Sequence, residues 1–317
     1  MGRLASIVRW AATIAVLILL GRALIDQWDA VRALSWHGTL SDVTLAVGFT
    51  AAGIFTLPLG LRELLAALDI HAGAYAWRIW LQAFIYKYVP GKVMLVAERI
   101  RLSRPLGLSA AQSTVIVLWE SIAQLVAGCL LVAIAWPLTG ASSSRIAPIL
   151  VIGLTAGLLG LAAFPSALRA LNQIDRIRAR LGRLDALPLT PIRLIRLVGV
   201  YALAWLWLGV GFYFAARCVA SLTSTDLVAT VMWYVAAYVF GWVASVAPAG
   251  VGLREGVLLI GLGERLSPAE ALGAAATGRL LVTVVEILCV AVVFLIPSVS
   301  SQDPRDSEMK TDRIQSE

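Results

Sequence analysis

The chain has 317 residues, of which 60% are hydrophobic and 14% are charged, and its mean hydropathy is +0.85. Several apolar runs reach the roughly 18–20 residues that cross a bilayer, so the composition predicts an all-α, polytopic helical membrane protein. Too few polar residues remain for a soluble catalytic domain of ordinary size. The net charge of +7 comes mainly from arginines that flank the apolar runs, so it does not indicate binding of nucleic acid. The three cysteines lie in apolar runs and only two histidines are present, so we expect no disulfide, no metal site and no cofactor.

Short polar segments separate the apolar runs, and one of them, 169–196, holds seven arginines. The positive-inside bias places this arginine-rich loop in the cytoplasm. The first run shows no clear cleavage site, so we expect an uncleaved anchor, and the polar tail 298–317 is expected to be disordered. In chain order the expected runs are about 7–24, 43–61, 74–89, 110–136, 148–168, 197–216, 228–247, 256–263 and 269–296.

Two Pro- and Gly-containing breaks interrupt the apolar pattern, Pro90-Gly91-Lys92 and the segment 248–255. In the second break, Pro248, Gly250 and Gly252 precede the charged pair Arg254-Glu255. Irregular backbone at bilayer depth is tolerated only where it is buried in protein or lines a wet cavity. Each break is therefore interpreted as the tip of a re-entrant hairpin that lines a site for a charged group. The alternative is a short loop between helices, with its charges at the lipid headgroups.

An internal repeat appears when the chain is shifted by 158 residues. Pro90 then falls on Pro248, 108–112 falls on 266–270, and 43–61 falls on 201–219. Each half consists of two spans, a hairpin and a further span. Repeat 1 covers about 7–136 and repeat 2 about 148–296, within one transmembrane domain, 1–297.

The two repeats are inverted if both hairpins are re-entrant, because three full spans then separate the hairpins. This arrangement places both termini, the arginine cluster at 99–104 and the loop 169–196 in the cytoplasm. If the hairpins instead cross the membrane fully, the chain has eight or more spans and the inversion is lost.

Five motifs resemble the transmembrane, flippase-like domain of the lysylphosphatidylglycerol synthases and its stand-alone relatives. The motifs are Pro90-Gly91-Lys92-Val93, Glu98-Arg99, Leu118-Trp119-Glu120, the segment 248–255 and Gly278-Arg279. The resemblance implies a multi-pass protein of a bacterial plasma membrane that handles an anionic or polyprenyl-linked lipid. It does not extend to the soluble aminoacyl-transfer domain, so we expect a stand-alone member without synthase activity. Two departures from the family pattern, at Met94 to Ala97 and at Ser121, remove charges that the family commonly has and leave the substrate open.

Charged side chains inside the spans are the candidate site residues, since each costs about 2.5–3.5 kcal/mol at a helix centre. Guanidinium groups offer forked donors and stay ionised when partly desolvated, which suits phosphate binding. We therefore expect Lys92, Arg99, Arg254 and Arg279 to bind substrate, with Glu98, Glu120, Glu255 and Glu286 in support. No catalytic residue is predicted. The alternative is that these groups are structural ion pairs that lock helices together.

The repeat makes a more specific prediction about two of these charges. Glu120 shifted by 158 residues falls on Gly278, next to Arg279. We therefore expect Glu120 and Arg279 to approach each other near the middle of the membrane.

The function predicted from these features is that of a lipid translocase, flippase or scramblase, for a membrane phospholipid or a polyprenyl-linked lipid. Two alternatives stay open: an intramembrane lipid-phosphate transferase or hydrolase, and a non-catalytic partner of a cell-envelope glycosyltransferase. The sequence also leaves the oligomeric state open, a homodimer included.

Overall fold

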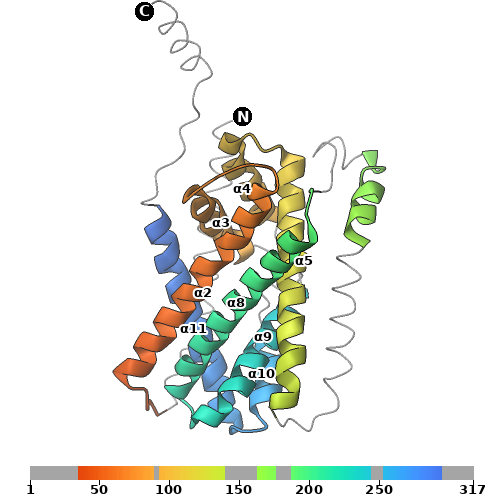
Figure 1. Cartoon of the computed structure of the whole chain (residues 1–317). Helices are drawn as coiled ribbons and strands as arrows, with labels where there is room; N and C mark the ends of the chain where they lie inside the picture. Colours follow the sequence, from red (N-terminus) through yellow and green to blue (C-terminus); the bar gives the residue numbers. More distant parts are fainter. Residues whose placement is uncertain (1–34, 89–92, 140–162, 176–186, 244–252, 295–317) are drawn as a thin grey trace, which may run out of the picture.

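The computed structural model describes residues 35–88, 93–139, 163–175, 187–243 and 253–294, and these form α-helices with short 3-10 turns and no strand. The predicted all-α fold is confirmed for this part of the chain. Four of its helices are long and apolar enough to cross a membrane (Figure 1). The expected runs 7–24 and most of 148–168, together with the tail 298–317, lie outside the described residues. The four long helices are α2 (Leu40–Ala66), α5 (Ala110–Ala135, continued by η3, Trp136–Leu138), α8 (Pro191–Arg217) and α11 (Pro268–Val293).

Shorter helices lie between the long ones. The α3–α4 pair lies toward one end of the bundle and the α9–α10 pair toward the other (Figure 1). The first pair comprises α3 (Tyr75–Phe84), η1 (Ile85–Tyr88), α4 (Val93–Ser103) and η2 (Arg104–Leu106). The second comprises η4 (Ser224–Asp226), α9 (Leu227–Val243) and α10 (Leu253–Leu262).

Side-chain caps set where the long helices begin. Ser109 accepts a hydrogen bond from the backbone of Gln112 at the start of α5, and Ser267 caps α11 in the same way through Glu270. Each is a capping box, which satisfies backbone donors that the helix leaves unpaired. Thr190 caps α8, so this helix begins several residues before the apolar run expected at 197 and takes up the end of the arginine-rich segment.

Glycines let the two central helices, α2 and α8, pack closely. A side chain at Gly53 would collide with Leu208, and one at Gly60 would collide with Tyr201. Small residues at such crossings allow backbones to approach in the absence of a hydrophobic driving force between lipid-embedded helices. The space above Gly60 is filled by the Tyr201 ring, which is fully buried.

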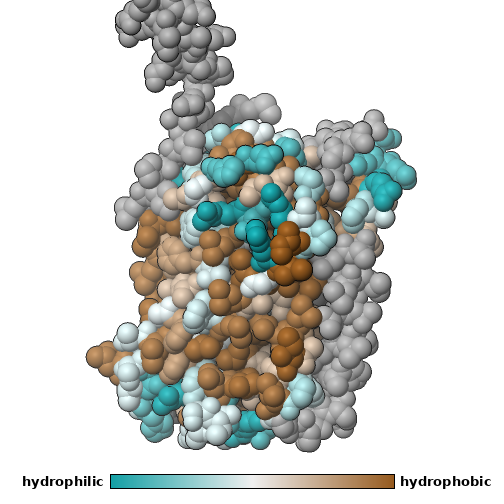
Figure 2. Space-filling view, in the orientation of Figure 1, coloured by the Kyte–Doolittle hydropathy of each residue, from teal (hydrophilic) through white to brown (hydrophobic). Residues whose placement is uncertain are grey.

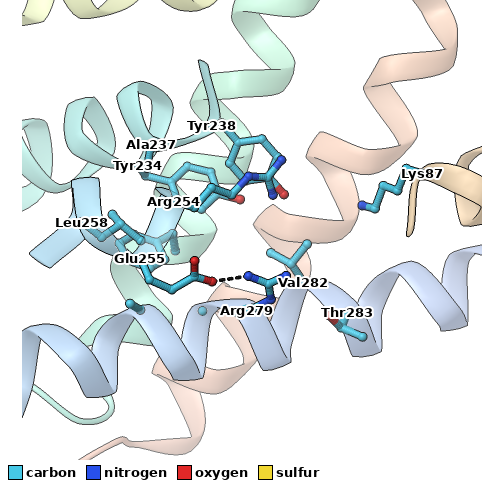
Figure 3. A pocket seen from close by; sticks show the side chains of 13 residues that line it. Lys87, Tyr234, Ala237, Tyr238, Arg254, Glu255, Leu258, Arg279, Val282 and Thr283 are labelled. Carbon is cyan, nitrogen blue, oxygen red and sulfur yellow. Dashed lines mark hydrogen bonds and ion pairs between the residues drawn. The ribbon is translucent and has the colours of Figure 1, made fainter. Parts of the chain in front are cut away.

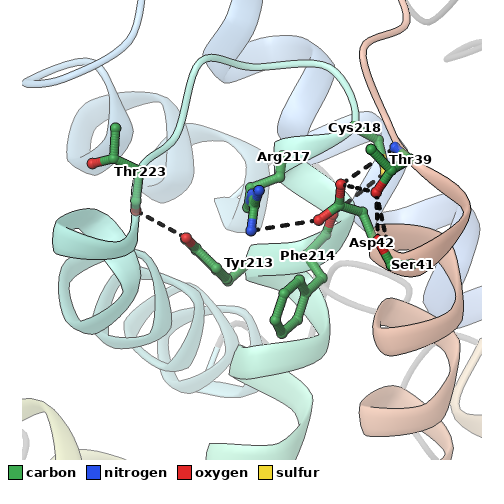
Figure 4. Close-up of polar contacts among 8 residues, drawn as sticks. All are labelled: Thr39, Ser41, Asp42, Tyr213, Phe214, Arg217, Cys218 and Thr223. Atoms are coloured by element: carbon green, nitrogen blue, oxygen red, sulfur yellow. Dashed lines mark hydrogen bonds and ion pairs between the residues drawn. The ribbon is translucent and has the colours of Figure 1, made fainter.

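Polar contacts tie the start of α2 to the end of α8 at one end of the bundle (Figure 4). Asp42 lies 3.5 Å from the guanidinium of Arg217 and accepts a hydrogen bond from the Thr39 hydroxyl. The backbone amide of His37 donates to the carbonyl of Cys218. These contacts hold α2 and α8 together at the end of the bundle, beyond its apolar middle.

Helix contacts in the first half have counterparts in the second. α5 packs on α8 as α11 packs on α2, α3 contacts α4 as α9 contacts α10, and α4 contacts α5 as α10 contacts α11. α5 and α11 also begin 158 residues apart, at Ala110 and Pro268. The pattern of contacts is therefore the same in the two halves.

The outer surface of the bundle carries an apolar band with polar side chains gathered toward both ends (Figure 2). On α11, for example, Val284, Ile287, Leu288 and Val292 are exposed large hydrophobic residues. Exposed contiguous apolar surface of this kind suits contact with lipid. The chain is a multi-pass membrane protein.

Candidate functional site

A cavity of about 270 Å³ lies where the long helices meet the two shorter helix pairs. Its wall is mainly apolar, but five charged side chains also line it. A concave, mostly apolar site with a few convergent polar groups is typical of ligand binding. The charged residues are Lys87, Arg99, Glu120, Arg254 and Glu286.

Glu120 and Arg99 form the ion pair of the first half. Glu120 on α5 is 3% exposed, and its carboxylate accepts from Arg99 Nη2 on α4 at 2.7 Å. Trp80 Nε1 and the Tyr201 hydroxyl donate to the same carboxylate, each at 3.1 Å. Buried charges persist only when they are paired and hydrogen-bonded, and Glu120 meets that requirement. One donor of the pair stays unused, because Arg99 Nη1 is buried without a hydrogen-bond partner.

Glu255 and Arg279 form the corresponding ion pair of the second half, between α10 and α11 (Figure 3). Both side chains are mostly buried and line a smaller cavity of about 40 Å³. Arg254 lines this cavity and the larger one. Three lining residues, Lys87, Tyr238 and Arg254, are shared, so the two cavities adjoin.

Arg254 is the second residue of α10 and stacks on an aromatic ring. Its guanidinium carbon lies 3.6 Å from the centroid of the Tyr238 ring (Figure 3). Gly241 on α9 makes room for it, since a Cβ there would lie 2.5 Å from Arg254 Cγ. Arg254 Nε is buried without a hydrogen-bond partner, and no carboxylate of the described residues forms an ion pair with Arg254. A cation–π contact contributes about 0.5–2 kcal/mol but supplies no counter-charge.

A third ion pair joins the two halves. Lys87, in η1 between α3 and α4, binds the Glu286 carboxylate of α11. Lys87 Nζ also lies 3.8 Å from the centroid of the Phe84 ring. The side chains of Lys87 and Glu286 are 12% and 8% exposed, so the pair is buried at the boundary between the halves.

Three of the predicted cations, Arg99, Arg254 and Arg279, therefore line the adjoining cavities, as do three of the predicted carboxylates, Glu120, Glu255 and Glu286. Glu98 lines neither cavity and pairs with Arg101 on the outer part of α4. The remaining predicted positions, Lys92 and the hairpin residues Pro90, Gly91, Pro248, Gly250 and Gly252, lie outside the described residues.

Glu120 and Arg279, which we expected to approach each other, do not form an ion pair with each other. Glu120 binds Arg99, and Arg279 binds Glu255. Each of these two charged residues pairs with a residue of its own half, which lies on the second helix of the adjacent short pair. The position of a charge along a helix does not determine which neighbouring helix supplies its partner.

Sequence reasoning missed the aromatic residues and the lysine of the site. Lys87 carried a usable signal, because a lysine within an apolar run needs a partner. Trp80, Tyr201 and Tyr238 carried none, since aromatic residues with polar atoms are common in apolar runs. Only the three-dimensional packing brings them to the charged groups.

A family model described as "Lysylphosphatidylglycerol synthase TM region" matches residues 3–290 of the 317-residue chain. No curated protein matches the chain.

Proposed function

The chain belongs to the lysylphosphatidylglycerol synthase TM family, and from this premise we propose that it is a lipid translocase of the flippase or scramblase type. Its substrate is an anionic or polyprenyl-phosphate-linked lipid, and its location is a bacterial plasma membrane. The observation that carries the proposal is Arg254, a cation at two adjoining cavities with no carboxylate partner among the described residues.

The physical problem for a translocase is to move a phosphate through hydrocarbon. An unshielded charge at the bilayer centre is costly, so the headgroup needs a counter-charge along its path while its tails stay in the lipid. Arg254 can supply forked N–H donors and a positive charge at that point. The start of α10 at Leu253 adds backbone donors and the positive end of the helix dipole nearby.

The proposed architecture is an inverted repeat with two re-entrant hairpins. The matching contacts of the two halves support it, as does the location of the two short helix pairs toward opposite ends of the bundle (Figure 1). Transporters use this arrangement to build a site from broken helices near the middle of the membrane. Single cysteines introduced at 180 and 308 are expected to label from the cytoplasmic side, and one at 265 from outside. Labelling of 180 and 265 from the same side would contradict the inversion.

The function is tested with purified protein in liposomes that contain fluorescent lipids, by following the loss of asymmetry and analysing the lipids for new products. We expect Arg254→Ala to lower the rate of translocation at least tenfold while the protein still inserts. Arg254→Lys keeps the positive charge but loses the forked N–H donors of the guanidinium, so it should retain part of the rate of translocation. Arg62→Ala is the matched control, because Arg62 on α2 also lies over an aromatic ring, Trp77 at 5.4 Å, and lines neither cavity.

The same assay separates the alternatives. New lipid products would favour a transferase or hydrolase. Neither translocation nor products with any lipid would favour a non-catalytic partner of a glycosyltransferase. An Arg254→Lys variant with full activity, beside an Arg254→Ala variant that fails to fold, would make Arg254 a structural cation and remove the phosphate site.

A further inference from the structure

We infer that the cavity selects a lipid phosphate with a single negative charge, a phosphodiester, over lipid phosphomonoesters. The inference rests on the proposed function and narrows its substrate class. Both a glycerophospholipid and a polyprenyl phosphosugar provide a singly charged phosphodiester, so the shared chemistry is the phosphodiester itself.

The charges that line the two adjoining cavities leave one positive charge in excess among the described residues. The cations are Lys87, Arg99, Arg254 and Arg279, and the carboxylates are Glu120, Glu255 and Glu286. Four cations face three carboxylates. The other ionisable groups on the lining are the phenols of Tyr234 and Tyr238, which as hydroxyl groups carry no charge.

The ion pairs identify the cation in excess. Glu120 binds Arg99, Glu255 binds Arg279, and Glu286 binds Lys87. Arg254 faces the Tyr238 ring instead of a carboxylate, and its Nε has no acceptor (Figure 3). A ligand with one negative charge balances the charges of the described lining residues. A ligand with two leaves an uncompensated negative charge in a low-dielectric region, which is strongly unfavourable.

Because of this charge balance, the affinity for a phosphomonoester should depend on pH, and the affinity for a phosphodiester should not. A phosphodiester keeps one negative charge throughout the neutral range. A phosphomonoester loses its second proton with a pKa near 6, so it must take that proton up again to bind as a monoanion. Its affinity should therefore fall about tenfold for each pH unit above 6, to roughly 100-fold at pH 8. Zwitterionic phosphatidylcholine leaves the excess positive charge in place and should bind more weakly than phosphatidylglycerol.

The test is calorimetric titration of the full-length protein in detergent micelles with two matched ligand pairs at pH 6, 7 and 8. The glycerolipid pair is dihexanoyl phosphatidylglycerol and dihexanoyl phosphatidic acid; the isoprenoid pair is geranyl phosphoglucose and geranyl phosphate. We expect the affinity of the better-bound diester to be independent of pH, and that of the matching monoester to fall tenfold per unit. Buffers of different ionisation enthalpy should report uptake of about one proton per monoester at pH 8 and none per diester. The pair that binds more tightly identifies the source of the headgroup.

A charge-altered variant makes the test specific to the cavity. Glu286→Gln removes one carboxylate from the lining and raises the excess to two positive charges. The monoester should then bind as a dianion, without proton uptake and with little dependence on pH. Glu264→Gln is the matched control, because Glu264 is exposed on the turn between α10 and α11 and lines neither cavity. It should behave as the unaltered protein does.

Equal binding of monoester and diester at pH 8 without proton uptake would overturn the inference, and so would a failure of all four ligands to bind. Diester-selective binding without translocation in liposomes would leave the inference standing and remove the proposed function. Translocation of every lipid regardless of charge, with no selectivity in binding, would overturn the inference and leave the proposed function standing.

Discussion

Removal of the Glu120 carboxylate is expected to destabilise the bundle strongly, because Arg99 would stay buried without its counter-charge. Glu120 and Arg99 are 3% and 5% exposed, and the carboxylate also accepts from Trp80 and Tyr201. Breaking a buried ion pair by deleting one partner costs about 3–5 kcal/mol. Each orphaned neutral donor adds up to about 1 kcal/mol, with incomplete additivity. We therefore expect Glu120→Ala to lower the free energy of unfolding by about 4–6 kcal/mol, and Tyr201→Phe by about 1 kcal/mol.

Double-mutant cycles test this assignment directly, with reversible unfolding in mixed micelles as the assay. Glu120→Gln combined with Arg99→Met should give a coupling energy of about 2–3 kcal/mol, since the two side chains are in contact. Glu120→Gln combined with Arg279→Met is the matched cycle. These two side chains share no hydrogen-bond partner, so the effects should add to within about 0.5 kcal/mol. Equal coupling in the two cycles, or a loss below about 1 kcal/mol for Glu120→Ala, would refute the reasoning.

Two further substitutions and one labelling experiment have different expected outcomes. We expect Gly241→Ala to lower the rate of translocation at least as much as Arg254→Lys does, because the added Cβ would lie 2.5 Å from Arg254 Cγ. The free energy of unfolding should not fall, since alanine is favoured over glycine in a helix by about 1 kcal/mol. A lower melting temperature with normal translocation would contradict this. Arg265→Ala removes a 3.3 Å ion pair with Asp226 and should cost about 1 kcal/mol in unfolding experiments, with lipid binding unchanged. Burial, with the nearby Asp42 charge, raises the pKa of the Cys218 thiol to about 11. Maleimide at pH 7.4 should therefore leave this thiol unmodified until the protein is denatured. Rapid labelling of the folded protein would contradict this prediction and show that the thiol is accessible.

The helical fold could be predicted from the sequence because its signals are local. Runs of apolar residues identify spans, and the spacing of Ser109 and Gln112 along the chain is already that of a capping box. Helix ends were predicted less well. The run expected at 43–61 lies within a helix that extends from Leu40 to Ala66, because hydrogen bonding along the backbone continues through Arg62 and Glu63 after the apolar pattern ends. Hydropathy shows whether a residue favours water or an apolar environment, whereas the position of a helix end also depends on capping and packing.

Six of the seven charged residues that line the two cavities, all but Lys87, could also be predicted, but their pairing could not. A charge in an apolar run is unusual enough to be noticed alone, which is why Glu120 and Arg279 stood out. Pairing depends on how each helix is rotated and on which helix crosses it, and these follow from contacts distant in sequence. Arg99 reaches Glu120 because α4 packs on α5, and Lys87 reaches Glu286 across 199 residues of chain.

The two halves place their ion pairs at corresponding sites but exchange the charges. In the first half the cation, Arg99, is on the short helix and the anion, Glu120, is on the span; in the second half Glu255 is on the short helix and Arg279 on the span. A buried pair must be neutral as a unit, and that requirement does not depend on which helix carries which sign. Pairs of this kind can therefore form the wall of the cavity without attracting a ligand. In the proposed function the attraction comes from Arg254, and α4 has no cation at the matching position, because Arg254 shifted back by 158 residues falls on Val96. The proposed anion site is accordingly assigned to the second half, at the start of α10.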